Sequence, residues 1–207
     1  MINLKVLIVT VTPSYKEIKE ETKRAVENLE RGNHVLDWLI VTEQFEDAGD
    51  EWRVSKTIWH NLEKARRIAL TEGYDYLLSL EWDIVPPQDA LLNLMSNKAD
   101  VVIGLYPERP SKVGSYLGDK LLVYNPGNCV PEAEEKVRCG LPFQINRGCG
   151  GFGCLLINRD VMERTQLSWE WYGKVYEKGF KVAIDPRVLC CHVDRDGTII
   201  KPVTSPL

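Results

Sequence analysis

The sequence predicts one α/β domain in which a mostly parallel sheet occupies the first half and a mixed arrangement the second. Short apolar runs rich in β-branched residues alternate with charged segments of helical character, which is typical of parallel strands joined by right-handed crossovers. After Pro107, Gly, Pro and Cys interrupt the chain at shorter intervals. The four expected strands of the first half are Leu4–Val11, His34–Val41, Tyr74–Leu80 and Ala99–Leu105.

Helices are expected in the segments between these strands. Ser14 is a suitable N-cap, and Glu17 completes a capping box three residues later. Gly32 and Asn33 are expected to end that first helix. Pro residues at 86 and 87 suit a first helical turn. The three expected helices are Ser14–Glu30, Val54–Thr71 and a segment from Pro86-Pro87 to Ser96.

The second half is expected to contain short strands and one helix. Asp196-Gly197 is a strong hairpin signal. The helix is expected over Trp169–Lys178. The expected extended pieces are Ser115–Tyr124, Phe143–Arg147, Phe152–Asn158, Lys181–Ile184 and Val188–Val193. Neither a linker nor a repeat interrupts the chain, so residues 1–207 are expected to form a single domain.

Bulk composition narrows the function. The 207 residues are 44% hydrophobic and 27% charged, as in ordinary globular proteins. The net charge of −4 and the pI near 5.5 argue against a nucleic-acid binder, which needs a basic face. An acidic protein can still bind a nucleotide when a divalent cation offsets the diphosphate charge.

A cytoplasmic protein is expected, because no targeting signal is visible and the cysteine spacing suits reduced thiols. The apolar run Val6–Val11 is too short for a signal peptide, and no window approaches the ~20 apolar residues of a membrane span. The six cysteines include no CxxC pair, so a zinc site is not expected. Reduced thiols are the expectation, with a Cys129–Cys139 bridge as the alternative in a hyperthermophile.

The most informative segment is the triplet Glu81-Trp82-Asp83, which directly follows a buried strand. Ligands of open α/β sheets bind beyond the carboxyl ends of the strands. Two carboxylates one residue apart at such an end can bind a hard cation directly or through water, and the cation can bridge a diphosphate. The alternative is a pair of solvated acids that opens a turn.

The stretch YDYLLSLEWDIVPPQDALLNLMSNKADVVIGLYPERP resembles the central segment of GT-A-fold glycosyltransferases, where a DxD motif lies between a strand and a helix. Similar pieces lie upstream, in VLIVTVTPSY, and downstream, in GCGGFGCLLINRDVME and EKGFKVAIDPRVLCCHVD. The resemblance spans roughly Lys5 to Asp194, and the chain also resembles the short, single-domain versions carried by phages and archaeal viruses. It implies a GT-A-like three-layer α/β/α fold, with a nucleotide-binding half over residues 1–106 and an acceptor-side half over residues 107–207.

This chain departs from the family pattern at three places. Glu81 stands where the first Asp of DxD is expected, and its longer arm suits binding through water. His60 replaces an Arg before Asn61. The acidic pair expected before the late helix is present only as Glu170, between two tryptophans.

The resemblance also implies roles for individual residues. His192, which alone would be taken as a structural histidine, completes a metal site for Mn²⁺ or Mg²⁺ with Glu81 and Asp83; Asp194 is the second choice. If the reaction inverts the anomeric carbon, Glu170 is the expected base that deprotonates an acceptor hydroxyl; a reaction that retains the anomeric configuration needs no such base. The expected contacts of the nucleotide sugar are Thr10, Thr12, Pro13, Glu43, Asn61, Glu81, Tyr106, Arg109, Gly150 and Gly151.

The expected function is metal-dependent transfer of a sugar from a UDP- or GDP-sugar to a glycan, protein or lipid acceptor. A nucleotidyltransferase is one alternative, although Thr12-Pro13-Ser14-Tyr15-Lys16 lacks the Gly-rich, basic signature expected after its first strand. A catalytically inactive sugar-binding or assembly protein is the other. The chain is expected to act in the cytoplasm, that of the host if the protein is viral.

Overall fold

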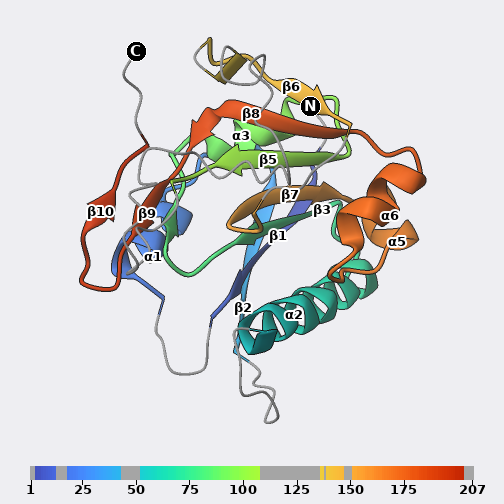
Figure 1. The fold of residues 1–207 in the computed structure, drawn as a ribbon, viewed down its shortest axis with the longest axis horizontal. Coiled ribbons are helices and arrows are strands. Elements are labelled where there is room, and N and C mark those ends of the chain that lie inside the picture. The colour runs from blue at the N-terminus through green and yellow to red at the C-terminus, as the bar shows by residue number, and fades with distance from the viewer. Residues whose placement is uncertain are drawn as a thin grey trace.

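A central sheet with helices on both faces forms the described part of the chain (Figure 1). The structure, a computed structural model, describes residues 3–12, 18–42, 52–107, 136–137, 139–146 and 151–202, without the side chains of 52–55. Within these ranges, no helix is both long and apolar enough to cross a bilayer.

The main sheet has seven strands in the order β2-β1-β3-β7-β5-β8-β6. β2, β1, β3, β5 and β8 point in one direction, because β1 pairs in parallel with β2 and β3, and β5 with β8, while β7 is antiparallel to both β3 and β5. β6 is antiparallel to β8. The strands are β1 Lys5–Val11, β2 Val35–Val41, β3 Tyr76–Leu80, β5 Val101–Leu105, β6 Phe143–Ile145, β7 Cys154–Asn158 and β8 Val182–Leu189. The predicted mostly parallel sheet with a mixed second half is therefore confirmed.

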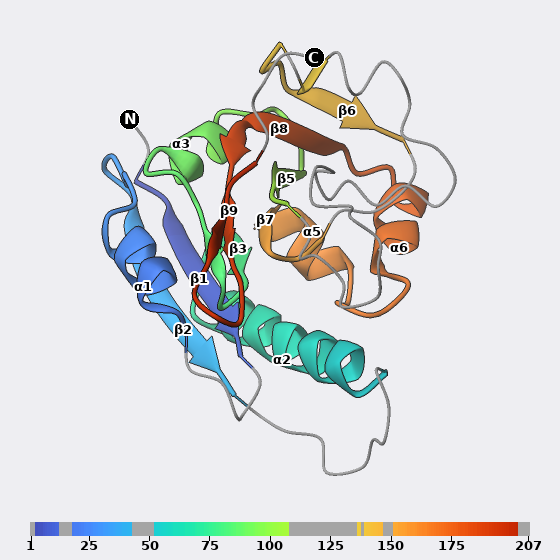
Figure 2. The same cartoon turned by 60° about the vertical axis from the view of Figure 1, so that its left-hand side comes forward.

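The helices divide between the two faces of the sheet (Figure 2). α1 (Glu20–Glu27) and α3 (Ala90–Met95) cover one face and contribute Val26, Leu91 and Leu94 to its core. The other face is covered by α2 (Trp52–Thr71), α5 (Arg159–Arg164) and α6 (Trp171–Glu177). Alternate residues of each buried strand point to opposite faces, so the continuous apolar runs fill both cores. This is the three-layer α/β/α architecture that was predicted.

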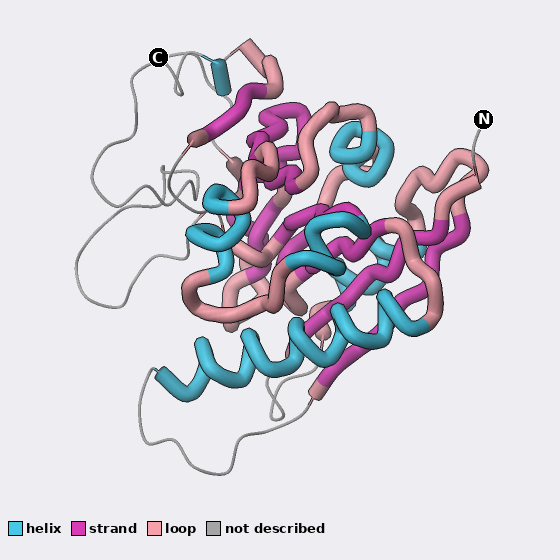
Figure 3. Tube along the Cα trace, turned by 90° about the vertical axis from the view of Figure 1, so that its right-hand side faces the viewer, coloured by secondary structure: helices cyan, strands magenta, loops and turns pink. Residues whose placement is uncertain are grey.

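The 20-residue α2 lies across its face of the sheet (Figure 3). Leu62, Ala65 and Ala69 are at most 1% exposed, and their spacing keeps them on one side of a helix with 3.6 residues per turn. The helix is followed by Gly73 at φ +76°, a conformation that favours glycine. α2 therefore offers one apolar side to the sheet and leaves its other sides for polar contacts.

Several predicted boundaries were wrong. The first helix begins at Glu20 rather than Ser14, because Lys19 is extended at φ −61° and ψ 141°; Ser14 itself lies outside the described residues. The third begins at Ala90, whose N–H still donates to the Pro87 carbonyl in a preceding turn. The late strands divide at Cys190 rather than before Val188, since β8 continues through Pro186.

Two elements were not predicted. α5 follows β7 directly, and the Asn158 side chain caps it by accepting a hydrogen bond from Val161 N–H at 3.0 Å. β4 (Ile84–Val85) joins β9 (Cys191–Val193) and β10 (Ile199–Ile200) in a small antiparallel sheet. The hairpin predicted at Asp196-Gly197 connects β9 to β10, with Gly197 at φ +89°. In this small sheet His192 is paired with Ile84, the residue after Asp83.

Candidate functional site

The turn Glu81–Ile84 leaves the carboxyl end of β3 and is fixed by its backbone. Glu81 N–H donates to the Gly153 carbonyl at 3.1 Å, and Ile84 N–H closes the turn on the Glu81 carbonyl at 3.2 Å. The Trp82 carbonyl accepts from Lys19 N–H at 3.0 Å, and the Asp83 carbonyl accepts from Val193 N–H at 2.8 Å. These hydrogen bonds attach the turn to the residue before β7, to the residue before α1 and to the last residue of β9. Asp83 is held with only 3% of its surface exposed.

His192 lies opposite Asp83, with its Nε2 atom 3.4 Å from Asp83 Oδ2. Its other ring nitrogen, Nδ1, lies 2.9 Å from the carbonyl oxygen of Pro107, just beyond β5. His192 is 7% exposed. Two buried side chains and one backbone carbonyl, from three separate segments, thus meet beyond the carboxyl ends of β3 and β5.

The orientation of this imidazole suits a metal ligand. A carbonyl oxygen can only accept a hydrogen bond, so Nδ1 must carry a proton. In a neutral ring, the lone pair of Nε2 is then directed toward a carboxylate oxygen. That contact is unfavourable unless a cation or a second proton lies between the two atoms. A histidine that donates its outer N–H to a carbonyl is the usual arrangement in metal sites, and one imidazole with one carboxylate suits Mn²⁺ or a similar ion.

Glu81 does not join this pair in a cluster. Among the residues that the structure describes, no three His, Cys, Asp or Glu side chains are grouped so that they could hold an ion. The side chain of Glu81 is partly exposed. Its predicted place in the metal shell stays a prediction, in which water would bridge carboxylate and cation. The remaining positions of an ion at Asp83 and His192 would be left to water or to ligand oxygens.

Tyr106 packs against His192 beside this pair. Its hydroxyl accepts a hydrogen bond from Gly153 N–H at 3.2 Å, and its ring meets that of His192 edge-on with centroids 6.2 Å apart. Burial raises the pKa of the Tyr106 phenol well above its ordinary value, and the negative charge of Glu81 adds to the shift. Tyr106 therefore stays protonated and uncharged beside the candidate metal ligands.

The glycines before β7 are explained by Tyr106. A Cβ atom at Gly151 would lie 1.7 Å from the Tyr106 hydroxyl, and one at Gly153 would lie 2.6 Å from Cζ. Both are far inside van der Waals contact, so only glycine lets this backbone pass over the ring. The sequence indicated a close approach here and assigned it to a sugar. The structure accounts for it by a side chain, and sugar contact at Gly151 stays a prediction.

Four aromatic side chains, Trp59, Phe152, Trp171 and Tyr172, form an aromatic wall between the Tyr106 region and α6. The ring of Phe152 contacts Trp59 at 4.5 Å, Trp171 at 5.5 Å and Tyr172 at 5.9 Å between centroids. Trp171 and Tyr172 are buried in the core. Glu170, the predicted base, immediately precedes them as the N-cap residue of α6, and its side chain is exposed.

The remaining predicted residues are only partly described. Thr10 and Thr12 are buried at the carboxyl end of β1, where Thr10 Oγ1 accepts from Trp38 Nε1 at 3.0 Å. Asn61 is fully buried in α2, whereas the neighbouring His60 is exposed. Four predicted contacts, Pro13, Glu43, Arg109 and Gly150, lie outside the described residues.

Sequence reasoning missed two groups that organise the site. The Pro107 carbonyl, which orients His192, has no sequence signal, because any residue offers a carbonyl. Ser79 had a sequence signal, since it is the only residue of β3 with a small polar side chain. Its hydroxyl donates to the Phe152 carbonyl at 2.7 Å and so anchors the backbone that passes over Tyr106.

The described cysteines form no disulfide. Cys139, Cys154, Cys190 and Cys191 are all free thiols, so the alternative bridge to Cys139 does not form; Cys129 lies outside the described residues. A hydrogen bond with the Cys154 thiol, together with burial, raises the pKa of Cys190 well above its usual value. Cys190 therefore behaves as an uncharged core group.

Comparison with known proteins finds similarity in structure alone. No family model matches the sequence, and no curated protein matches it. A197 from STIV has a TM-score of 0.57 at 14% identity, over 99% of this chain and 97% of that one. GalNAc-T7, crystallised with UDP, GalNAc and Mn²⁺, has the same score and identity over 98% of this chain, which spans 45% of its length. A glycosyltransferase involved in glycosylation of the major capsid of PBCV-1 has a TM-score of 0.41 at 14% identity, over 84% of this chain and 76% of that one.

The structure and these neighbours agree on the class of fold. The seven-stranded, mostly parallel sheet with helices on both faces, and the two neighbours that cover nearly all of this chain, define a GT-A-like fold. The fold predicted from the resemblance is thereby confirmed.

Proposed function

We propose that this protein is a metal-dependent glycosyltransferase that takes a sugar from a nucleoside-diphosphate sugar. The observation that carries the proposal is the Asp83–His192 pair, whose Nε2–Oδ2 separation of 3.4 Å and Pro107 contact suit a cation between the two side chains. The pair follows the carboxyl end of a sheet strand, where open α/β sheets bind ligands. The GT-A-like fold and the Mn²⁺ and UDP in the GalNAc-T7 structure agree with this assignment.

Each residue of the proposed centre has a separate task. Asp83 would supply the charged oxygen ligand from a turn that its backbone hydrogen bonds hold in place. His192 would supply a neutral nitrogen, with Pro107 fixing the tautomer. When bound, the Mn²⁺ or Mg²⁺ ion would supply positive charge to the diphosphate as it leaves the sugar. Thr10 and Thr12, at the end of β1, would lie under the nucleotide base.

Glu170 is the proposed base on the acceptor side. Its exposed carboxylate lies at the N-cap of α6, directly beside the aromatic wall that leads to Tyr106. There it would accept the proton of an acceptor hydroxyl as the new glycosidic bond forms, and the sugar would be inverted at its anomeric carbon. The acceptor is a hydroxyl of a glycan, a protein or a lipid.

The proposal is tested by ligand-dependent stability and by transfer. UDP- and GDP-sugars are added to the protein with and without Mn²⁺, and the melting temperature is recorded. A ligand that binds only the native state stabilises it by about 2.7 kcal/mol at a hundredfold excess over Kd. We expect one nucleotide sugar to stabilise the protein only when Mn²⁺ is present.

Turnover then separates glycosyl transfer from its alternatives. Release of nucleoside diphosphate, with the sugar moved to an acceptor or to water, supports the proposal. Release of pyrophosphate from a nucleoside triphosphate and a sugar phosphate would identify a nucleotidyltransferase instead. Metal-dependent binding without any turnover would indicate an inactive sugar-binding protein.

A further inference from the structure

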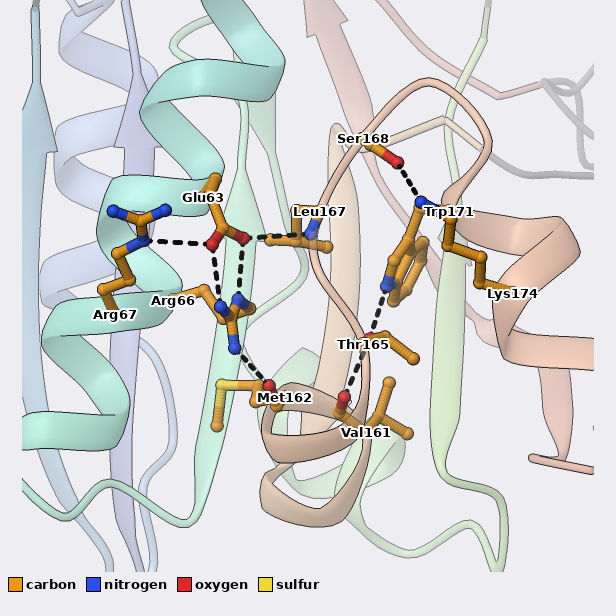
Figure 4. Close-up of polar contacts among 10 residues, drawn as sticks. All are labelled: Glu63, Arg66, Arg67, Val161, Met162, Thr165, Leu167, Ser168, Trp171 and Lys174. Atoms are coloured by element: carbon orange, nitrogen blue, oxygen red, sulfur yellow. Dashed lines mark hydrogen bonds and ion pairs between the residues drawn. The ribbon is translucent and has the colours of Figure 1, made fainter. Parts of the chain in front are cut away.

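A carboxylate on α2 reaches across to the segment that precedes Glu170 (Figure 4). Glu63 Oε2 accepts a hydrogen bond from the backbone N–H of Leu167 at 3.0 Å. The same carboxylate forms a two-point pair with Arg66, through Nε at 2.7 Å and Nη2 at 2.7 Å. Arg67 Nε also donates to Oε1 at 3.1 Å. One side chain thus joins α2 to the connection between α5 and α6.

Arg66 extends this contact to the other end of the connection. Its Nη1 donates to the backbone carbonyl of Met162 in α5. Arg66 is only 7% exposed, and the Glu63 side chain is 15% exposed. Burial alone would raise the pKa of Glu63, but the hydrogen bonds from Arg66 and from Leu167 N–H outweigh it and hold that pKa below its ordinary value. The pair is therefore charged and holds two backbone groups, one on each side of residues 163–166.

A second contact fixes the rest of the segment from the side of α6. Trp171 Nε1 donates to Thr165 Oγ1 at 2.9 Å, and the same hydroxyl donates to the Val161 carbonyl at 2.7 Å. Trp171 N–H closes a turn on the Ser168 carbonyl at 2.9 Å. The stretch Thr165–Glu170 is thus held at its start and middle, while Trp169 and Glu170 themselves are exposed.

We propose that Glu63 is a positioning residue, which sets the position of the segment Thr165–Glu170 and thereby of Glu170 on the acceptor side of the site. The inference rests on the proposed function, because it needs the acceptor to bind at this segment. Glu63 acts only through the backbone of Leu167. It is not expected to contact the nucleotide, the metal or the sugar.

The chain offers a matched control for the test. Glu163, on α5, pairs with Arg159 at 2.7 Å in an exposed i, i+4 ion pair on the same helix. Each variant removes one carboxylate: Glu63→Ala also removes the ion pairs with Arg66 and Arg67, and Glu163→Ala removes the pair with Arg159. Hydrogen exchange of the peptide that contains Leu167 measures the segment itself, independently of any activity. We expect faster exchange in Glu63→Ala and wild-type exchange in Glu163→Ala.

Kinetics measure the functional consequence. Glu63→Ala should lower kcat for transfer to the acceptor by about tenfold to 10²-fold, since misplacement by about 1 Å from a distant change can cost that much. Mn²⁺-dependent binding of the nucleotide sugar and slow hydrolysis of the donor by water should stay within about twofold of wild type, because these steps do not need the positioned segment. Glu63→Gln, which has the same length and keeps one acceptor for Leu167, should show a smaller effect on both exchange and kcat. If Glu63→Ala does not fold, the same exchange and kinetic measurements on Glu63→Gln test the proposal.

The outcomes separate this inference from the proposed function. Unchanged exchange at Leu167 in Glu63→Ala overturns the positioning role, whatever the kinetics. Faster exchange with normal transfer also overturns it, because the position of the segment would then not matter. A wild-type protein that binds nucleotide sugar but transfers none overturns the base and the positioning role together, while the metal centre stands. A wild-type protein that binds no nucleotide sugar removes the proposed function itself.

Discussion

His192 faces Asp83 with its ring nitrogen Nε2 3.4 Å from Oδ2, while Nδ1 is turned to the Pro107 carbonyl at 2.9 Å. The two side chains come from segments far apart in the sequence, and the pairing of β4 with β9 brings them together. Because Nδ1 must hold its proton to bond a carbonyl, Nε2 can neutralise the contact only by gaining a proton or a cation. The first two predictions test which of these applies.

Asp83→Ala should abolish sugar transfer without unfolding the protein. A polar residue at a strand end serves a site rather than a core, so its loss should remove the stabilisation that nucleoside diphosphate gives in the presence of Mn²⁺, about 2.7 kcal/mol at a hundredfold excess over Kd. Thermal shift and turnover are measured together. Glu81→Ala should have a milder effect, since a ligand that acts through water is partly replaceable. Normal turnover in Asp83→Ala would exclude the metal role.

His192→Ala should weaken Mn²⁺ binding by at least about tenfold, because loss of even an outer-shell partner costs 10- to 100-fold in affinity. Protons compete with the metal for Nε2, so binding to the wild-type protein should weaken as the pH is lowered. Isothermal titration with Mn²⁺ on both proteins measures this. If His192 instead forms a proton-bridged structural pair with Asp83, the variant will lose melting temperature and keep its metal affinity.

The elements that the sequence predicted are those with a strong local signal. Continuous apolar runs identified β1, β2, β3 and β5, and Asp-Gly identified the β9–β10 hairpin. α5 was missed because Arg159–Arg164 is shorter than two helical turns and shows no readable period. The insertion of antiparallel β7 between β3 and β5 is a tertiary property, which the order of segments along the chain does not contain.

Some residues of the candidate site were likewise recognisable from local sequence, and others were not. The place of Asp83 after a buried strand was enough to single it out, and the family resemblance was needed for His192. The role of Gly151 was assigned to a ligand because a sequence reveals that a backbone needs space but not what occupies it. Here the occupant is Tyr106, which directly follows β5 and is far from Gly151 in the sequence.

Two glycine-to-alanine changes should have effects of opposite sign. Gly151→Ala places a methyl group 1.7 Å from the Tyr106 hydroxyl, so it should lower the free energy of unfolding by about 1–3 kcal/mol, as overpacking does. Gly173→Ala lies inside α6, has no atom within 4 Å of its added Cβ and has no positive φ. It should raise that free energy by roughly 0.5–1 kcal/mol. Denaturant unfolding of both variants checks the two signs.

The contact between Tyr106 and Gly151 can also be tested by relief. The double variant Gly151→Ala/Tyr106→Ala should show less destabilisation than the sum of its two single variants, because removing the ring removes the clash. Additive effects would mean that the methyl group at residue 151 does not meet Tyr106.

Tyr74 should make the protein less stable at alkaline pH. Burial, together with a hydrogen bond from its hydroxyl to Asp37 Oδ2 at 2.8 Å, raises the Tyr74 pKa from 10.0 to about 12. Between these values the native state holds a proton that the unfolded chain has lost, so stability falls as the pH rises from about 10 to 12, by roughly 2–3 kcal/mol in all. The stability of Tyr74→Phe relative to wild type should therefore improve over this range. A constant difference between the two proteins would show that Tyr74 titrates normally.

Glu170→Gln tests the chemistry of the acceptor side. The change keeps the size of an exposed side chain at the N-cap of α6 and removes only its ability to take a proton. Transfer should slow by about 10²–10⁴-fold, the usual contribution of a general base. Binding of the nucleotide sugar should be nearly unchanged, and slow hydrolysis of the donor should persist, because the proposed metal centre at Asp83 and His192 is intact. Glu177→Gln, on the same helix and also exposed, is the matched control and should be fully active.

NMR of the wild-type product should show an anomeric configuration inverted relative to the donor, because a base on the acceptor side implies direct displacement. A retained anomer, or near-normal turnover in Glu170→Gln, would mean that the acceptor proton leaves by another route.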